Sequence, residues 1–321
     1  MGSIHTIQKP PVEARVRLLA LSGLLGLVCC FLTGVCSAED RDPAPQVLDV
    51  FASIPPQIHF VEAIGKERVS CTAMVDPGES PATYEPTPKQ IAALGKARLY
   101  FRIGVPFESI WMERIQEANP DMKVVDTAEG VDLLPMKRHY HGEDGDHAHS
   151  SAKSSGDKDG RKDPHVWLSV EAVKTQARNI CNAFVTEDPD GRTFYEQNLD
   201  LFLDDLGRLD RTIADIFAKV SSRKFIALHP AWGYFARDYG LEQIPVELEG
   251  KQPSAKSLTH LIQLAQSENI RVVVVQRQFS TASARVIAEA IGARVVQLDP
   301  LDADYMENMK RIARTLAEAM K

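Results

Sequence analysis

The stretch that decides the fold is residues 193–220, which read TFYEQNLDLFLDDLGRLDRTIADIFAKV. Its apolar residues recur at spacings of three and four: Leu199, Phe202, Leu206, Leu209, Ile213, Ile216 and Val220. This spacing places them on one face of a single long amphipathic helix. Since a flexible hinge would be rich in Gly, Ser or Pro, we interpret 193–220 as a rigid connecting helix.

The segment before this helix, residues 46–190, alternates β-rich runs with helical patterns. We expect strands at 47–51, 69–75, 99–101 and 123–125. Helices are expected at 55–65, from Thr87, and at 106–119, and prolines stand in the first turn of each. Alternating strands and helices predict a mostly parallel sheet with helices on both faces.

The segment after the helix, residues 221–321, repeats this alternation. Strands are expected at 224–228, 243–246, 272–275 and 294–298, and helices from Trp232, Ser254, Thr281 and Asp304. The predicted fold class is therefore α/β, with two small parallel-sheet lobes joined by one long rigid helix. A rigid connection between two such lobes favours a ligand cleft between them.

Residues 1–38 have the pattern of a secretory signal peptide. Arg15 and Arg17 precede an apolar run at 18–35, and Cys36-Ser37-Ala38 supplies small residues for cleavage before Glu39. The alternative is a membrane anchor, because the apolar run is near the lower length limit for a span. Cysteines in the run leave lipid anchoring open. We expect export to the periplasm or another extracytoplasmic location.

Composition narrows the possible functions. The formal charge of −7 at pH 7 argues against a nucleic-acid-binding protein, which needs a basic face. Beyond residue 38 the chain has only two cysteines, Cys71 and Cys181. An oxidising compartment would allow them to pair, but sequence cannot show that they come within reach.

Residues 137–162 lack periodicity and nearly all apolar side chains, so we expect a disordered loop inserted in the first lobe. It holds His139, His141, His147 and His149, interleaved with acidic residues. A dense His/Asp/Glu tract is a compositional signal for metal binding, and imidazole suits zinc, copper, nickel and iron. The loop is interpreted as an auxiliary metal-collecting site; the alternative is an incidental polar loop.

Two further histidines lie in more structured settings. His165 follows the loop, in Asp163-Pro164-His165-Val166-Trp167-Leu168, and His229 follows the strand expected at 224–228. In open α/β sheets, ligands bind beyond the carboxyl ends of the strands. Taken alone, each of these histidines would more often be a structural residue.

Five motifs occur in order: DPGESPATYEPTP at 76–88, DPHVWL at 163–168, LHPAWGYF at 228–235, VQRQFS at 275–280 and LDPL at 298–301. Together they resemble the metal-specific solute-binding proteins of bacterial ABC transporters, the ZnuA/TroA-type family. The resemblance runs from about Val47 to the end of the chain. It implies a non-enzymatic, monomeric receptor that delivers Zn²⁺, or less readily Mn²⁺ or another divalent metal, to a membrane permease.

The chain departs from the family pattern at two ligand positions. Ala82 stands where the family has its first histidine, and Ser280 stands where many members have a carboxylate. His59 is the leading candidate replacement, and the weaker candidates are water and the side chains of Gln278, Glu85, Glu247 and Glu249. Aligning 53–60 with 228–235 places it opposite Tyr234, one turn into the first helix. The alternative is that His59 fills an aromatic position.

The predicted function is capture of zinc between the lobes, with His165 and His229 clamping the ion and His59 as a third ligand. A protein of the same architecture that binds a metal chelate or an organic ligand is the alternative, made more plausible by Ala82 and Ser280. A metallohydrolase is disfavoured, since no His-Glu-x-x-His or Gly-x-Ser-x-Gly motif occurs.

Overall fold

The computed structural model describes residues 47–136, 162–246 and 254–321. The expected signal peptide and the histidines at 139, 141, 147 and 149 lie outside these ranges. Residues Pro45–Lys321 form one compact unit, to which everything below refers. Among the described helices, none combines the length and apolar character needed to cross a membrane.

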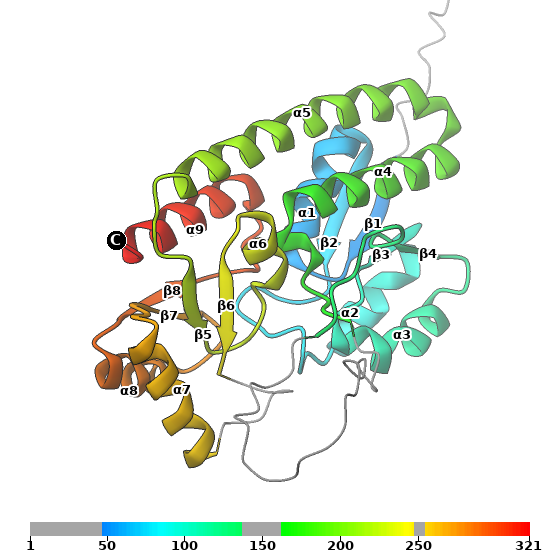
Figure 1. Cartoon of the computed structure of the whole chain (residues 1–321). Helices are drawn as coiled ribbons and strands as arrows, with labels where there is room; N and C mark the ends of the chain where they lie inside the picture. The colour runs from blue at the N-terminus through cyan, green and yellow to red at the C-terminus, as the bar shows by residue number, and fades with distance from the viewer. Residues whose placement is uncertain (1–46, 137–161, 247–253) are drawn as a thin grey trace, which may run out of the picture. The chain divides into compact units, whose positions relative to one another are not determined.

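The first lobe is built on a parallel sheet of strands β1 (Leu48–Ala52), β2 (Val69–Ala73), β3 (Leu99–Arg102) and β4 (Lys123–Asp126), in the order β2-β1-β3-β4 (Figure 1). Helices α1 (Pro55–Gly65), α2 (Pro88–Ala93) and α3 (Pro106–Ala118) follow the first three strands. Each begins at a proline, which fits the first turn because its nitrogen has no proton left unbonded there. Thr87 also caps α2 by accepting from Gln90 N.

The second lobe repeats this topology. Its parallel strands are β5 (Lys224–Ala227), β6 (Glu242–Pro245), β7 (Val272–Gln276) and β8 (Arg294–Leu298), in the order β6-β5-β7-β8. The helices are α6 (Gly233–Asp238), α7 (Ala255–Ser267), α8 (Thr281–Ile291) and α9 (Tyr305–Ala319). Strand β7 is buried throughout, as expected for a run of valines covered on both faces.

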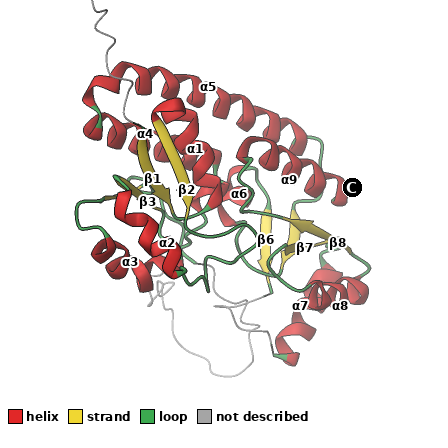
Figure 2. Ribbon diagram, turned by 180° about the vertical axis from the view of Figure 1, so that it is seen from behind, coloured by secondary structure: helices red, strands yellow, loops and turns green. Residues whose placement is uncertain are grey.

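Helix α4 (Val170–Glu187) packs on α1 of the first lobe, and helix α5 (Arg192–Phe217) connects the lobes. The 26-residue α5 packs against α1, α4 and α9 (Figures 1 and 2). Its predicted stripe faces inward: Phe202, Leu206, Leu209 and Ile213 are buried. Short 3₁₀ turns η1 to η4 occur at Lys66–Arg68, Leu94–Lys96, Val166–Leu168 and Pro189–Gly191.

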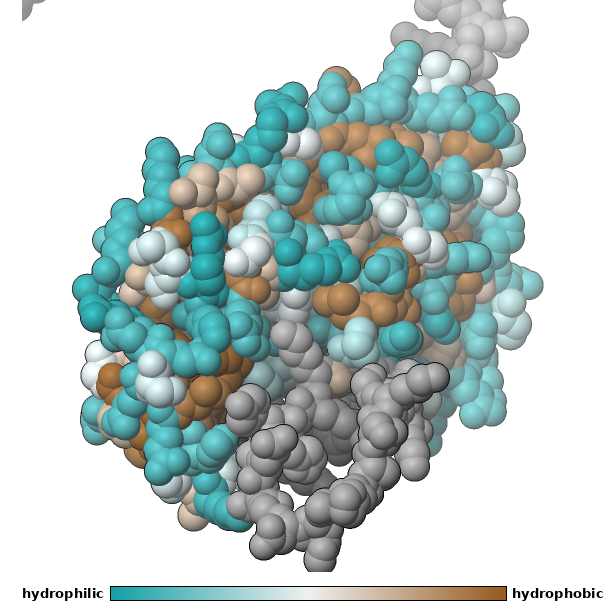
Figure 3. Space-filling model, viewed as in Figure 1, coloured by the Kyte–Doolittle hydropathy of each residue, from teal (hydrophilic) through white to brown (hydrophobic). Residues whose placement is uncertain are grey.

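One hydrophobic core continues from the first lobe through α5 into the second, where it includes Phe225, Tyr305 and Leu316. A smaller core beneath α7 and α8 includes Val273 and Ile287. Hydrophilic side chains predominate on the face shown in Figure 3, with hydrophobic ones scattered among them. The predicted two-lobed α/β fold with one long connecting helix is confirmed, and the shared core joins the lobes firmly.

Both cysteines in the described part of the chain are free thiols: Cys71 is half-buried on β2, and Cys181 is buried on α4. Burial raises the pKa of the Cys181 thiol to about 11. The sequence left open whether these cysteines form a disulfide, and in the structure they are two separate thiols.

Candidate metal-binding site

His165 lies at the junction of the lobes, immediately before the 3₁₀ turn η3. The side chains of that turn are buried, and Trp167 Nε1 donates a 2.7 Å hydrogen bond to the Pro300 carbonyl oxygen in the second lobe. The turn is therefore held by both lobes. The His165 side chain is only 12% exposed.

Asp163 orients the His165 imidazole. Its Oδ1 accepts a 3.0 Å hydrogen bond from His165 N and lies 2.6 Å from His165 Nδ1. Because an ionised carboxylate has no proton to give, Nδ1 must carry the proton, and Nε2 is left with its lone pair. Metal-binding histidines are held in this way by a carboxylate on the other ring nitrogen.

The second lobe also supports this segment. The buried Tyr234 of α6 donates from its hydroxyl to the Asp163 carbonyl oxygen at 2.8 Å and accepts from Leu134 N at 3.0 Å. One phenol thus ties together the two chain segments on either side of 137–161. The backbone carrying Asp163 and His165 is fixed accordingly.

His229 lies just beyond the carboxyl end of β5, where Leu228 N donates to Val274 O of β7. Its ring stacks on Phe279, with the ring centroids 5.2 Å apart and the planes at 21°. His229 Nε2 lies 3.4 Å from His165 Nε2. The structure therefore brings together two of the histidines predicted from the sequence, one from each lobe.

That 3.4 Å separation has a chemical meaning. Two nitrogens bound tetrahedrally to one zinc ion at about 2.0–2.1 Å lie about 3.3–3.4 Å apart. The two Nε2 atoms therefore stand at a spacing that fits one zinc ion, and a hydrogen bond between the two rings gives the same spacing when no ion is bound.

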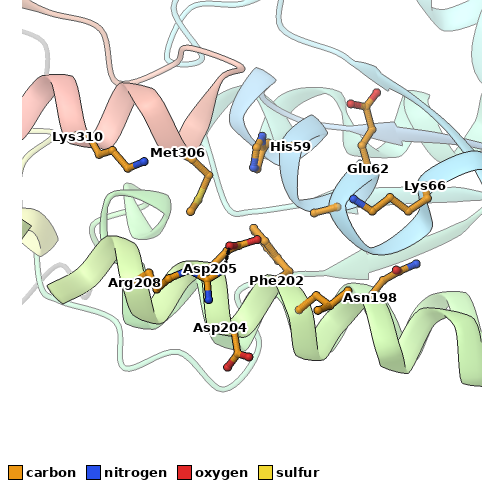
Figure 4. Close-up of a pocket in the computed structure, with 12 residues that line it drawn as sticks. His59, Glu62, Lys66, Asn198, Phe202, Asp204, Asp205, Arg208, Met306 and Lys310 are labelled. Carbon is orange, nitrogen blue, oxygen red and sulfur yellow. Dashed lines mark hydrogen bonds and ion pairs between the residues drawn. The ribbon is translucent and has the colours of Figure 1, made fainter. Parts of the chain in front are cut away.

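His59 lies elsewhere. The face of α1 that carries it points toward α5 and α9, where its ring centroid is 5.9 Å from Phe202 and 6.4 Å from Tyr305. It lines a groove of about 670 Å³ between these helices (Figure 4). Burial lowers the pKa of His59, opposed by the nearby carboxylates of Asp304 and Asp205. The structure does not bring His59 to the histidine pair and matches the aromatic-position alternative.

Ala82 and Ser280, which stand at two ligand positions of the family pattern, also provide no further metal ligand. Ala82 is exposed in the loop before α2, which is anchored by Phe107 N donating to Pro81 O at 3.1 Å. Ser280 caps α8 by accepting from Ala282 N at 3.2 Å. Within the described ranges, no group of three or more His, Cys, Asp or Glu residues could together hold a metal ion.

Sequence reasoning missed Asp163, Tyr234 and Phe279 as supports of the histidines. A signal for Asp163 was present, because an acid two residues before a histidine, with a rigid proline between them, can reach the Nδ1 side of the ring. Tyr234 and Phe279 act across the fold, so no local pattern marks them.

Two α/β lobes of one topology, joined by a long helix and contributing one histidine each to their junction, define a two-lobed solute-binding protein. The family model of the periplasmic zinc-uptake complex component A, ZnuA, matches residues 50–319, and the chain belongs to this family. This confirms the family predicted from the motifs. Proteins of the family are solute-binding components of ABC transporters and not enzymes.

Individual proteins are similar to this chain over two thirds of its length or more. The high-affinity zinc uptake system protein ZnuA of Bacillus subtilis (strain 168) is 30% identical over 294 residues, which cover 88% of each chain. A crystal structure of ZnuA superimposes with a TM-score of 0.77 at 42% identity, covering 86% of this chain and 100% of that one. The manganese-binding lipoprotein MntA of Halalkalibacterium halodurans is 28% identical over 68% of each chain.

Proposed function

We propose that this protein binds a zinc ion between His165 and His229 outside the cytoplasm and delivers it to the permease of an ABC transporter. The observation that carries the proposal is the 3.4 Å separation of the two Nε2 atoms. The donor set fits the ion, since neutral imidazole nitrogens are common zinc ligands.

The chain's own residues suggest how binding works. Asp163 holds the proton on His165 Nδ1, so that Nε2 is available as a donor. Stacking on Phe279 restricts the rotation of the His229 ring. Because the histidines come from different lobes, a bound ion favours the arrangement in which the lobes are together, by its higher affinity for that state.

The comparisons support zinc over manganese. A solved ZnuA deletion mutant with zinc bound shares 42% identity and covers 86% of this chain. The manganese-binding relative shares 28% identity over a shorter stretch. Imidazole donors suit zinc, whereas manganese prefers oxygen donors.

The location, the partner and the auxiliary site are parts of the same proposal. The family description names a periplasmic component of an uptake complex, which fits the signal-like pattern of residues 1–38. We expect a monomer that docks on a permease. His139, His141, His147 and His149 would collect metal weakly and pass it to the histidine pair.

The test is calorimetric titration of the metal-free protein with zinc, alongside two variants. One replaces His165 and His229 by alanine, and the other replaces the four loop histidines by alanine. We expect one tight site in the wild type and in the loop variant, and its loss in the pair variant. If tight binding survives in the pair variant, the proposed site is wrong.

A second candidate, binding of a metal chelate, is favoured by Ala82, whose methyl group cannot coordinate. A two-histidine site leaves coordination positions that the donors of a small chelator could fill. Titration with a preformed zinc–histidine complex separates the two. Tight binding of the complex without binding of free zinc would support the chelate receptor.

A further inference from the structure

Three residues lie beyond the carboxyl ends of neighbouring strands in the second lobe. β5 pairs with β7, and β7 pairs with β8, all in parallel. His229 follows β5, Gln278 follows β7 and Asp299 follows β8. Because the carboxyl ends of parallel strands meet at one edge of a sheet, these side chains belong to one ligand-binding edge.

Gln278 at this edge is held in one orientation. Its Nε2 donates to Asp299 Oδ1 at 3.2 Å, and that oxygen also accepts from Leu301 N at 2.9 Å. A carboxylate only accepts, so the amide must turn its nitrogen toward Asp299 and its oxygen away. The direction of the Gln278 amide is thereby determined.

The amide oxygen of Gln278 lacks a hydrogen-bond partner among the described residues. Its Oε1 atom is enclosed by the protein, and no donor in the described part of the chain reaches it. An enclosed acceptor without a donor costs free energy, and such an atom calls for a function. A cation is one of the few groups that satisfies a carbonyl-type oxygen without a hydrogen bond.

The neighbourhood of Gln278 connects it to the histidine pair. The next residue, Phe279, stacks on the His229 ring. Asp299 is followed by Pro300, whose carbonyl accepts from Trp167 in the turn after His165. The residue next to Gln278 therefore contacts the histidine of the second lobe. The residue next to Asp299 contacts the turn that follows the histidine of the first lobe.

We infer that the amide oxygen of Gln278 is a third protein donor to the metal ion held by His165 and His229. This inference rests on the proposed function. An amide oxygen is a harder donor than imidazole, so this site should separate zinc from manganese less sharply than a three-histidine site.

The test compares Gln278→Leu, which removes the donor, with Gln278→His, which restores a third imidazole. Gln297→Leu is the matched control, because Gln297 is an exposed glutamine on β8 in the same lobe. Zinc and manganese dissociation constants are measured by competition titration. The visible spectrum of the Co²⁺-loaded protein reports the donor set, and thermal unfolding verifies that each variant folds.

For Gln278→Leu we expect zinc affinity to fall about tenfold or more, with an altered Co²⁺ spectrum. Gln278→His should bind zinc at least as tightly as the wild type and prefer it more strongly over manganese. Gln297→Leu should change nothing.

The inference would be overturned if Gln278→Leu bound zinc with wild-type affinity and gave an unchanged Co²⁺ spectrum. In that case the proposed function would still stand, provided that the variant lacking His165 and His229 loses zinc binding. If the wild type binds no zinc, the proposed function fails as well. If Gln278→Leu does not fold, Gln278→His provides the test. An unchanged preference for zinc over manganese and an unchanged Co²⁺ spectrum in Gln278→His would then overturn the inference.

Discussion

The Asp163 carboxylate lies 2.6 Å from Nδ1 of His165, and this contact decides which imidazole nitrogen is left to bind a metal. Asp163 is itself 5% exposed and its backbone carbonyl is held by Tyr234. A buried acid, a histidine and a phenol from the opposite lobe therefore form one positioning unit.

Asp163→Asn should weaken zinc binding by about 10–100-fold, because an amide can accept from Nδ1 but no longer stabilises the positive charge that coordination draws onto the ring. Competition titration measures the loss. Asp190→Asn, at an exposed acid in η4, is the control and should bind as the wild type does. Equal affinity in Asp163→Asn would show that the contact does not support the ligand.

Zinc affinity should decrease as the pH falls, because an imidazole must be neutral to coordinate and histidine protonates near pH 6.5. The loss should be steeper than for a site with one imidazole ligand, because a two-imidazole site binds the ion only when both rings are neutral. Titrations at about pH 7.5 and about pH 5.5 bracket the ordinary histidine value. A flat profile across that interval would argue against coordination by the pair.

His59→Phe should leave zinc affinity unchanged and should reduce the acid sensitivity of the fold. Burial lowers the pKa of His59 in the folded state, so the unfolded chain binds the extra proton more readily. The stability tied to this group is present above the unfolded-state pKa and is lost as the pH falls toward the lower folded-state value.

Urea unfolding of the wild type and His59→Phe at about pH 7.5 and about pH 5.5 measures this effect. The difference between the two pH values should be smaller in the variant, whose stability at the higher pH should change by less than about 1.5 kcal/mol. A clear fall in zinc affinity in His59→Phe would mean that His59 is a ligand after all.

Trp167→Phe should destabilise the protein by about 2 kcal/mol or more, because it leaves the Pro300 carbonyl without its buried donor and opens a small cavity. Trp111→Phe is the matched control. Trp111 is half-buried on α3, and the guanidinium of Arg114 lies over its ring. A phenylalanine ring can still make this cation–π contact. Urea unfolding compares the two, and equal losses would show that the hydrogen bond between the lobes contributes nothing.

Local pattern was sufficient for the architecture. The apolar spacing along 193–220 predicted α5 within a few residues of its ends, Arg192 and Phe217. The run of valines at 272–275 predicted the buried strand β7, and the prolines at 55 and 106 marked helix starts. These features depend on neighbours three or four residues away, which is the range that sequence periodicity reports.

The candidate site was predicted only in part. His165 and His229 could be singled out by motif, and the structure brings them together, whereas His59 faces α5 and α9 instead. Matching 53–60 to 228–235 compared positions along the chain, but the direction in which a helix turns a side chain depends on what packs against it. The free thiols of Cys71 and Cys181 are a second case, since no sequence spacing measures a distance in space.

The sequence by itself therefore determined the two α/β lobes, the connecting helix, the family and the two histidines. Only the tertiary structure decided the 3.4 Å approach of those histidines, the roles of Asp163 and Tyr234, and the orientation of Gln278. The physical reason is one of range. Helices and strands follow from local periodicity, while the site is assembled from segments that meet only when the two lobes pack on their shared core.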